Sequence, residues 1–159
     1  MKNFSKMSIK EKFLFIMKIM FNIEIGGMLY YMIEVAYRGR SHISMFLVGG
    51  LCFVFIGLIN EYFKYDMYIE LQVIIGTLIV LVIEFISGCI LNILLKLNVW
   101  DYSNLPGNIL GQICPQFALL WIPIVLFGIW LDDFLKYTYF TGYEKPYYRS
   151  WILEKIKTI

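Results

Sequence analysis

Ionisable side chains lie inside two otherwise apolar stretches of this sequence. Glu34 precedes Arg38 by four residues, and Glu84 lies in a second long apolar run. An acid four residues before a base is the favourable order for an ion pair on a helix. Ionised groups within a membrane span are costly, so they usually face the protein interior and pair there or bind a ligand. Both glutamates are therefore candidates for a ligand site or for ion pairs that hold helices together.

A polar stretch, VWDYSNLPGN at residues 99–108, separates two apolar runs. Asp101 and Ser103 supply turn chemistry, and Trp100 and Tyr102 are of the types enriched at the boundary between membrane and water. We expect a structured loop at 96–112 that covers the outer end of a helical bundle and brings Asn108 and Gln112 near the glutamates. We also expect Arg40 or His42 to reach Glu84 from an earlier loop. The candidate site residues are Glu34, Arg38, Arg40, His42, Glu84, Asn92, Trp100, Asp101, Tyr102 and Ser103.

The composition places these residues in a membrane protein. Hydrophobic residues make up 60% of the 159 residues, against roughly 45–50% in soluble domains. The net charge of +2 is too small to indicate nucleic-acid binding. We expect a single all-α membrane domain over residues 1–159, too short to include a soluble catalytic domain as well.

Four apolar segments, each of about the 20 residues that a helix needs to cross a bilayer, predict a polytopic protein. They lie at 13–37, 44–63, 71–95 and 113–131. The first segment is too long and too charged for a cleavable signal peptide. A Ser-x-x-Glu capping box at Ser8 and Glu11 predicts that its helix starts near Ser8, within a cationic interfacial stretch at 1–18. Residues 146–159 are predicted to form an amphipathic cytoplasmic helix with Trp151 on its apolar face.

The distribution of lysine and arginine predicts that both termini are cytoplasmic in a multi-pass cell-membrane protein. The connection after the third segment carries only Lys96. The basic residues at the two ends are Lys2, Lys6, Lys10, Lys12 and Lys18, then Lys136, Lys145, Arg149, Lys155 and Lys157. Loop 96–112 is then extracytoplasmic.

The chain also contains an internal duplication. Gly26 and Glu34 recur at an offset of fifty as Gly76 and Glu84, and FIGLINEYF at 55–63 resembles LFGIWLDDF at 126–134. We interpret the four helices as two parallel helical-hairpin repeats, which places both glutamates at the same depth. The stretch after Cys89 then either extends the third helix or turns back into the membrane. The alternative is a chance match between apolar segments.

Recognised catalytic motifs are missing from the sequence. It has no phosphate-binding loop, no H-E-x-x-H and no G-x-S-x-G. Its three cysteines lack metal-ligand spacing. We therefore expect no cofactor, no metal and no ATPase activity of its own, and we do not expect an enzyme.

Several segments resemble a bacterial membrane-protein family, the CmpB-like ABC-transporter type IV family. They are YRGRSHISMF, FISGCILN, NVWDYSNLPGNILGQIC and LDDF, within a resemblance from about residue 24 to residue 134. The resemblance implies a membrane subunit of an ABC transporter. The hypothesis is a transport-associated subunit that binds a polar or lipid-like ligand in an outward-facing pocket. Alternatives are an intramembrane enzyme acting on a lipid or cell-envelope precursor, and a structural or regulatory protein. Expected partners are membrane lipids, a second copy or a second permease chain, and a separate ATPase.

Overall fold

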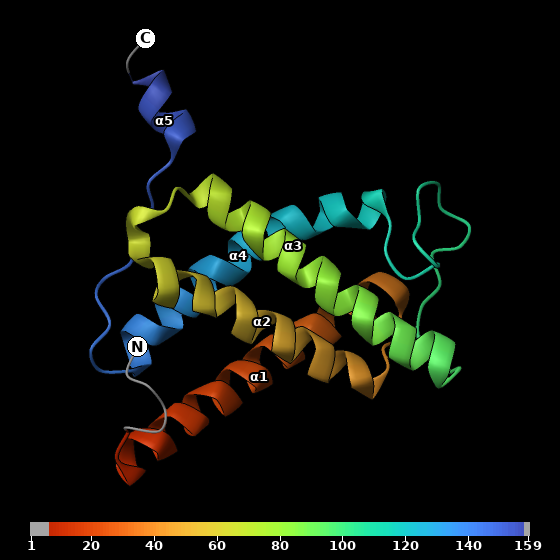
Figure 1. Cartoon of the computed structure of the whole chain (residues 1–159), viewed down its shortest axis with the longest axis horizontal. Helices are drawn as coiled ribbons and strands as arrows, with labels where there is room; N and C mark the ends of the chain where they lie inside the picture. The colour runs from red at the N-terminus through yellow and green to blue at the C-terminus, as the bar shows by residue number, and fades with distance from the viewer. Residues whose placement is uncertain (1–6, 158–159) are drawn as a thin grey trace. The chain divides into compact units, whose positions relative to one another are not determined.

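The protein is built from helices, and four of them are long and apolar enough to span a membrane, as the sequence predicts (Figure 1). The structure, a computed structural model, describes residues 7–157 except for the side chain of Lys64. The elements are α1 (Ile9–Arg38), α2 (Ile43–Phe63), η2 (Lys64–Asp66), α3 (Ile69–Gly88), η3 (Cys89–Leu94), α4 (Pro115–Tyr139) and α5 (Trp151–Ile156). Lys2, Lys6 and the last two residues of the predicted tail helix lie outside the described residues.

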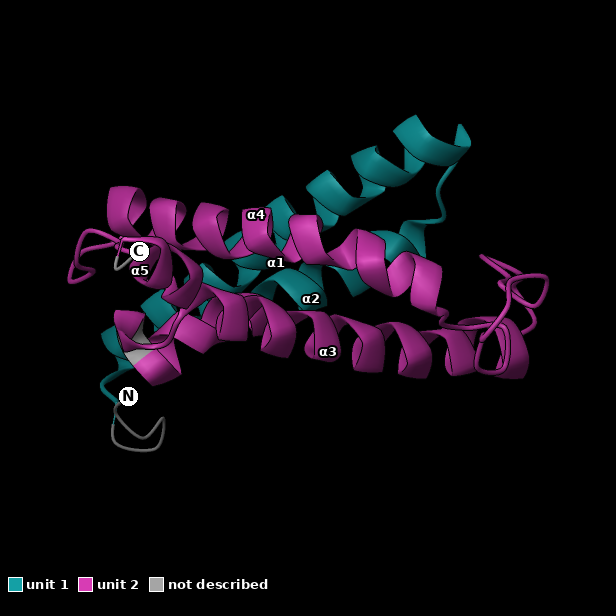
Figure 2. Cartoon of the chain, turned by 90° about the horizontal axis from the view of Figure 1, so that it is seen from above, with its two compact units in different colours: residues 1–54 teal, residues 55–159 magenta. Residues whose placement is uncertain are grey.

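The chain divides into two compact units, Met1–Val54 and Phe55–Ile159 (Figure 2). In the first unit, the capping box predicted at Ser8 is present and starts α1. The helix ends at Gly39, whose left-handed backbone (φ 73°) lets the chain turn toward α2. A Cβ atom on Gly26 would lie 2.2 Å from Phe53 Cβ, so the lack of a side chain allows α1 to approach α2 closely.

The second unit is built around α3 and α4, which pack against each other (Figure 2). Gly76 allows this approach, because a Cβ atom there would lie 2.5 Å from Val125 Cγ1. Val80 and Val125 have no exposed surface, so they form part of the core. Gly26 and Gly76, which the duplication pairs, thus both lie at tight helix contacts. The arrangement as two parallel hairpin repeats stays a prediction.

Helix α4 is longer than the predicted segment 113–131. It begins at Pro115, a residue suited to the first helical turn, and it continues past Leu131 to Tyr139. Its polar residues Asp132, Asp133 and Lys136 do not end the helix, because all three are buried against other polar groups of the unit.

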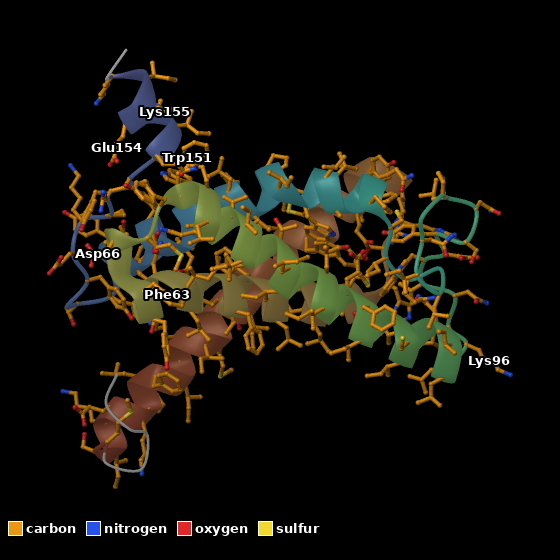
Figure 3. All side chains as sticks on the ribbon, turned by 45° about the horizontal axis from the view of Figure 1, so that its top comes forward. Phe63, Asp66, Lys96, Trp151, Glu154 and Lys155 are labelled. Carbon is orange, nitrogen blue, oxygen red and sulfur yellow. The ribbon has the colours of Figure 1, made fainter. Side chains whose placement is uncertain are left out.

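The third helix continues beyond Cys89 instead of turning back. Residues 89–94 form the π-helix η3, in which the Leu95 N–H donates to the Ile90 carbonyl at 2.9 Å. Lys96 and Asn98 then adopt left-handed backbone conformations, with φ of 53° and 49°, and reverse the chain. Lys96 and Asp66 mark opposite ends of this unit (Figure 3).

The tail helix is shorter than the predicted 146–159. Ser150 caps α5 by accepting from the Leu153 N–H at 3.2 Å. Residues 146–149 are not helical, and the Arg149 carbonyl instead accepts from the Ile69 N–H at 2.8 Å. Trp151 is exposed on α5 (Figure 3). Binding of this helix to the membrane interface stays a prediction.

Candidate functional site

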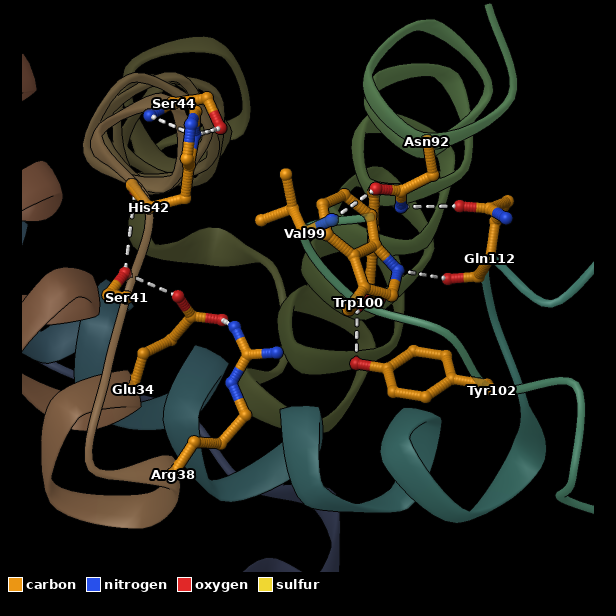
Figure 4. Close-up of polar contacts among 11 residues, drawn as sticks. Glu34, Arg38, Ser41, His42, Ser44, Asn92, Val99, Trp100, Tyr102 and Gln112 are labelled. Atoms are coloured by element: carbon orange, nitrogen blue, oxygen red, sulfur yellow. Dashed lines mark hydrogen bonds and ion pairs between the residues drawn. The ribbon is translucent and has the colours of Figure 1, made fainter. Parts of the chain in front are cut away.

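In the first unit, the structure contains the ion pair that the i, i+4 spacing predicts. Arg38 Nη2 donates to Glu34 Oε1. The chain beyond Gly39 returns so that Ser41 Oγ also donates to Glu34, on its Oε2 atom (Figure 4). Glu34 is buried, with 8% of its surface exposed. Its carboxylate is therefore held by one cation and one hydroxyl group.

Arg40 and His42 lie in the connection between α1 and α2, and both are exposed. His42 Nδ1 lies 2.7 Å from Ser44 Oγ and accepts from the Ser44 N–H at 3.2 Å (Figure 4). This is a local cap at the start of α2 and needs no ligand. A contact from Arg40 or His42 to Glu84 stays a prediction.

In the second unit, Glu84 is a buried carboxylate that joins three segments. Trp121 Nε1 on α4 donates to Glu84 Oε2 at 3.0 Å, and the Tyr102 hydroxyl in the loop donates to Oε1 at 3.2 Å. Tyr102 also stacks on Phe117, with ring centroids 4.4 Å apart. Only 3% of Glu84 is exposed. Through this carboxylate, Tyr102 and Trp121 tie the loop to α3 and α4.

The loop after η3 is an ordered structure built on side-chain amides. Asn92 accepts from the Val99 N–H at 2.7 Å and donates to Gln112 Oε1 at 2.8 Å (Figure 4). Trp100 Nε1 donates to the Gln112 carbonyl at 3.0 Å. Trp100 is 5% exposed, so its ring packs inside the protein and does not serve as the interfacial anchor that its residue type suggested.

Asp101 and Ser103 form the predicted turn within this loop. The Ser103 N–H donates to Asp101 Oδ1 at 2.8 Å, and the Ser103 hydroxyl donates to the same oxygen. These bonds favour the ionised carboxylate, so they lower the pKa of Asp101 below its ordinary value. Asn108 extends the turn by accepting from the Gly111 N–H at 2.9 Å. Both Asp101 and Ser103 are exposed, and their bonds shape the loop.

A second polar cluster of this unit was not among the candidate residues. It is centred on Lys136, which is 2% exposed. The Lys136 ammonium donates to the Gly57 carbonyl at 2.7 Å and pairs with Glu61 at 2.7 Å and Asp132 at 2.6 Å. A Cβ atom on Gly57 would lie 2.4 Å from Asp132 Oδ1, so the glycine makes room for this carboxylate. The ammonium thus lies among one carbonyl and two carboxylates.

Asp133 belongs to the same cluster but has different partners. Its Oδ2 atom accepts from Asn60 Nδ2 at 2.6 Å and from the Tyr148 hydroxyl at 2.9 Å. Burial raises the pKa of the Tyr148 phenol and, with nearby acids contributing, raises that of Tyr143 to about 12. Both phenols thus stay protonated donors at neutral pH.

The cluster borders a cavity of about 200 Å³. Its lining combines carboxylates, an amide, a lysine and two phenols. The residues are Asn60, Glu61, Tyr65, Asp133, Lys136, Gly142, Tyr143 and Glu144. The sequence held one signal of this cluster, because the duplication pairs Glu61 with Asp132, and these two acids meet at Lys136.

A family model described as "Putative ABC-transporter type IV" matches residues 19–141. The chain belongs to this family. The match includes all ten candidate residues and most of the Lys136 cluster. Together with the four apolar helices, it identifies an ABC-transporter type IV protein, a multi-pass membrane protein associated with transport and with other transporter components. No curated protein and no solved structure matches the chain.

Proposed function

We propose that this chain is a membrane subunit of an ABC-type transporter, that a separate ATPase drives it, and that it binds a polar or lipid-like ligand at its extracytoplasmic end. The proposal rests on family membership and on one observation, the Glu84 carboxylate, which is 3% exposed inside an apolar span. An ionisable group at such a position is a functional candidate by default, because inserting it into the membrane is costly.

The contacts of Glu84 suggest how a ligand reaches it. Trp121 belongs to a long helix packed on α3, whereas Tyr102 belongs to the loop that covers the carboxylate. Displacing Tyr102 breaks its hydrogen bond to Glu84 Oε1, while Trp121 keeps the other oxygen in place. A ligand with a hydrogen-bond donor can then replace the phenol. The bonds of Asn92 and Gln112 keep the loop ordered, so we expect it to move as one piece.

In the first unit, the Glu34–Arg38 pair supplies both signs of charge. The predicted orientation places this pair at the extracytoplasmic end of α1. Arg38 retains partial exposure of its side chain, 27%, so a phosphate or carboxylate group of a lipid-like ligand can approach it. A second copy of the chain or a second permease chain completes the pathway, because four helices form a thin wall.

The ATPase is tested first. The tagged chain is produced at native level in its own host, extracted in mild detergent after cross-linking, and analysed by mass spectrometry. We expect a chain with a G-x-x-x-x-G-K-[ST] motif in stoichiometric amount, and bound lipids are identified in the same sample. If no such chain is recovered, and a co-purified lipid is chemically altered with time, the chain is an enzyme and the proposal is wrong.

Glu84→Gln tests the ligand site within the purified assembly. We expect the variant to assemble with the ATPase but to lose stimulation of ATP hydrolysis by lipid extract. Glu24→Gln is the matched control, because Glu24 is also an acid of an apolar helix but is exposed on α1. Unchanged stimulation in Glu84→Gln, or equal loss in both variants, contradicts the role of Glu84.

A further inference from the structure

The cavity beside Lys136 contains a carboxylate without a cationic partner. Glu61 and Asp132 share the Lys136 ammonium, at 2.7 and 2.6 Å. Asp133 forms no ion pair with any described residue, and its hydrogen-bond partners Asn60, Tyr148 and Tyr65 are neutral. It is nevertheless 2% exposed. A buried carboxylate is stable in ionised form only if a positive charge or several hydrogen bonds compensate for the lost hydration.

Asn60 supplies a second, independent observation at the same cavity. The residue is 9% exposed, and its Nδ2 atom donates to Asp133. Its Oδ1 atom is buried and accepts no hydrogen bond from any described residue. Buried acceptors normally have a donor, and an unsatisfied one is costly. Since Asn60 lines the cavity beside Asp133, an occupant with N–H donors satisfies both residues.

The charges of the cavity exclude an anion as occupant. The Lys136 ammonium already donates to the Gly57 carbonyl, and its charge is compensated by the carboxylates of Glu61 and Asp132 at 2.7 and 2.6 Å. The other charged groups of the lining, Glu61, Asp133 and Glu144, are carboxylates. An incoming negative charge is therefore repelled, and a positive charge is attracted.

The lining favours an organic cation over a metal ion. Residues 7–157 contain no group of three or more His, Cys, Asp or Glu side chains suited to hold a metal ion. Tyr65 and Tyr143 also line the cavity, and aromatic rings attract organic ammonium groups through their π faces. The volume of about 200 Å³ is below the roughly 300–1,000 Å³ of drug-sized sites, which indicates a compound of a few heavy atoms.

We propose that this cavity binds a small primary alkylammonium ion. The Asp133 carboxylate pairs with the ammonium group, Asn60 Oδ1 accepts one of its hydrogens, and the rings of Tyr65 and Tyr143 lie beside the ammonium group and its alkyl chain. On the predicted orientation, the cavity lies at the cytoplasmic end of the protein. The site is separate from the proposed extracytoplasmic ligand site. Its binding of the cation is measured on the isolated chain and does not depend on whether an ATPase is recovered.

Propylammonium chloride is the probe, titrated calorimetrically into the full chain in lipid nanodiscs. We expect saturable binding, at least tenfold weaker for sodium, magnesium and propionate ions at equal ionic strength. Tetramethylammonium, which has no N–H donor, is expected to bind more weakly than propylammonium. Preferred binding of sodium or magnesium makes the site a metal site and overturns the proposal, as does the absence of saturable binding.

Two variants locate the site. Asp133→Asn removes the charge and keeps nearly the same shape, and Asn60→Leu removes the amide oxygen; each is expected to weaken propylammonium binding at least tenfold. Asp101→Asn, in the exposed turn of the loop, is the matched control and is expected to bind normally. Normal binding by a folded Asp133→Asn protein overturns the proposal.

A measurement on the unaltered protein covers the case in which neither variant folds. A ligand that binds only the folded state raises the midpoint of thermal unfolding. We expect propylammonium chloride to raise the unfolding midpoint in a saturable manner. In sodium chloride at the same concentration, we expect a lower midpoint than in propylammonium chloride. Equal midpoints in the two salts overturn the proposal.

Discussion

Lys136→Met is expected to destabilise the protein strongly. The lysine side chain is 3% exposed and compensates the carboxylates of Asp132 and Glu61, which are 1% and 13% exposed. Removing one partner of a buried ion pair costs about 3–5 kcal/mol, because the remaining charge stays buried without compensation. Here two carboxylates and the Gly57 carbonyl lose the same ammonium group, so we expect the upper part of this range.

The assay is equilibrium unfolding in mixed micelles with increasing sodium dodecyl sulfate, followed by helical circular dichroism. Glu154→Gln is the control, because it breaks an ion pair with Arg149 at 3.3 Å whose side chains are 49% and 45% exposed. Exposed pairs contribute little, so we expect little change in the control. If Lys136→Met is no more destabilising than Glu154→Gln, the lysine does not hold these segments together.

A triple variant separates uncompensated charge from lost packing. Adding Glu61→Gln and Asp132→Asn to Lys136→Met removes both buried negative charges. Replacing a whole buried ion pair by neutral groups is often close to neutral for stability, so we expect the triple variant to be more stable than Lys136→Met alone. A triple variant that is less stable than the single one contradicts the electrostatic explanation.

Three further changes test other contacts of the structure. Trp121→Phe removes the N–H that Glu84 accepts at 3.0 Å and is expected to cost about 1–3 kcal/mol of unfolding free energy, measured as above, with a smaller cost in a Glu84→Gln background. Ser103→Ala removes a bond that lowers the pKa of Asp101, so in an NMR titration the pKa is expected to rise toward its ordinary value. Because a lowered pKa stabilises the fold at neutral pH and this contribution is lost as the pH falls through it, the variant should be less stable at neutral pH and should lose less stability on acidification. Gly76→Ala places a Cβ atom 2.5 Å from a valine methyl group of α4 and is expected to cost about 1–3 kcal/mol; unchanged unfolding contradicts the close packing of α3 and α4.

The four spans and the start of α1 could be predicted because both signals are local. A run of about 20 apolar residues predicts a membrane-spanning helix regardless of its neighbours. The capping box needs only Ser8 and Glu11, three residues apart. The Glu34–Arg38 pair was also predictable, since both residues lie on one face of one helix.

The Lys136 cluster could not be predicted, because it depends on contacts between distant segments. Asn60 and Asp133 are separated by 73 residues in the chain. Without these contacts, two adjacent aspartates at the end of an apolar run indicate the end of the span. The structure shows instead that the helix continues, that Asn60 of α2 donates to Asp133, and that Glu61 of α2 pairs with Lys136.

The loop residues show the same limit at the level of single side chains. Trp100 and Trp121 both have an indole N–H, but the sequence does not show which acceptor each one reaches. Trp100 donates to a backbone carbonyl of its own loop, and Trp121 donates to Glu84. Residue type alone favoured the membrane interface for Trp100, whereas its position in the fold buries it.

Adjacent aspartates on α4 are expected to have separable roles. Successive residues point about 100° apart around a helix. Asp132 therefore faces the Lys136 ammonium at 2.6 Å, while Asp133 faces Asn60 at 2.6 Å and the cavity. Asp132→Asn removes a compensated charge, so we expect a less stable protein that still binds propylammonium once folded.

Asp133→Asn leaves the lysine pairs in place, so we expect stability close to that of the unaltered protein and loss of propylammonium binding. Unfolding in mixed micelles and calorimetry, applied to both variants, measure the two effects independently. If Asp132→Asn alone abolishes binding, or if both variants lose stability equally, the two carboxylates act as one structural group. The distinction between the lysine-paired acid and the ligand-binding acid then fails, because it depends on their facing different partners.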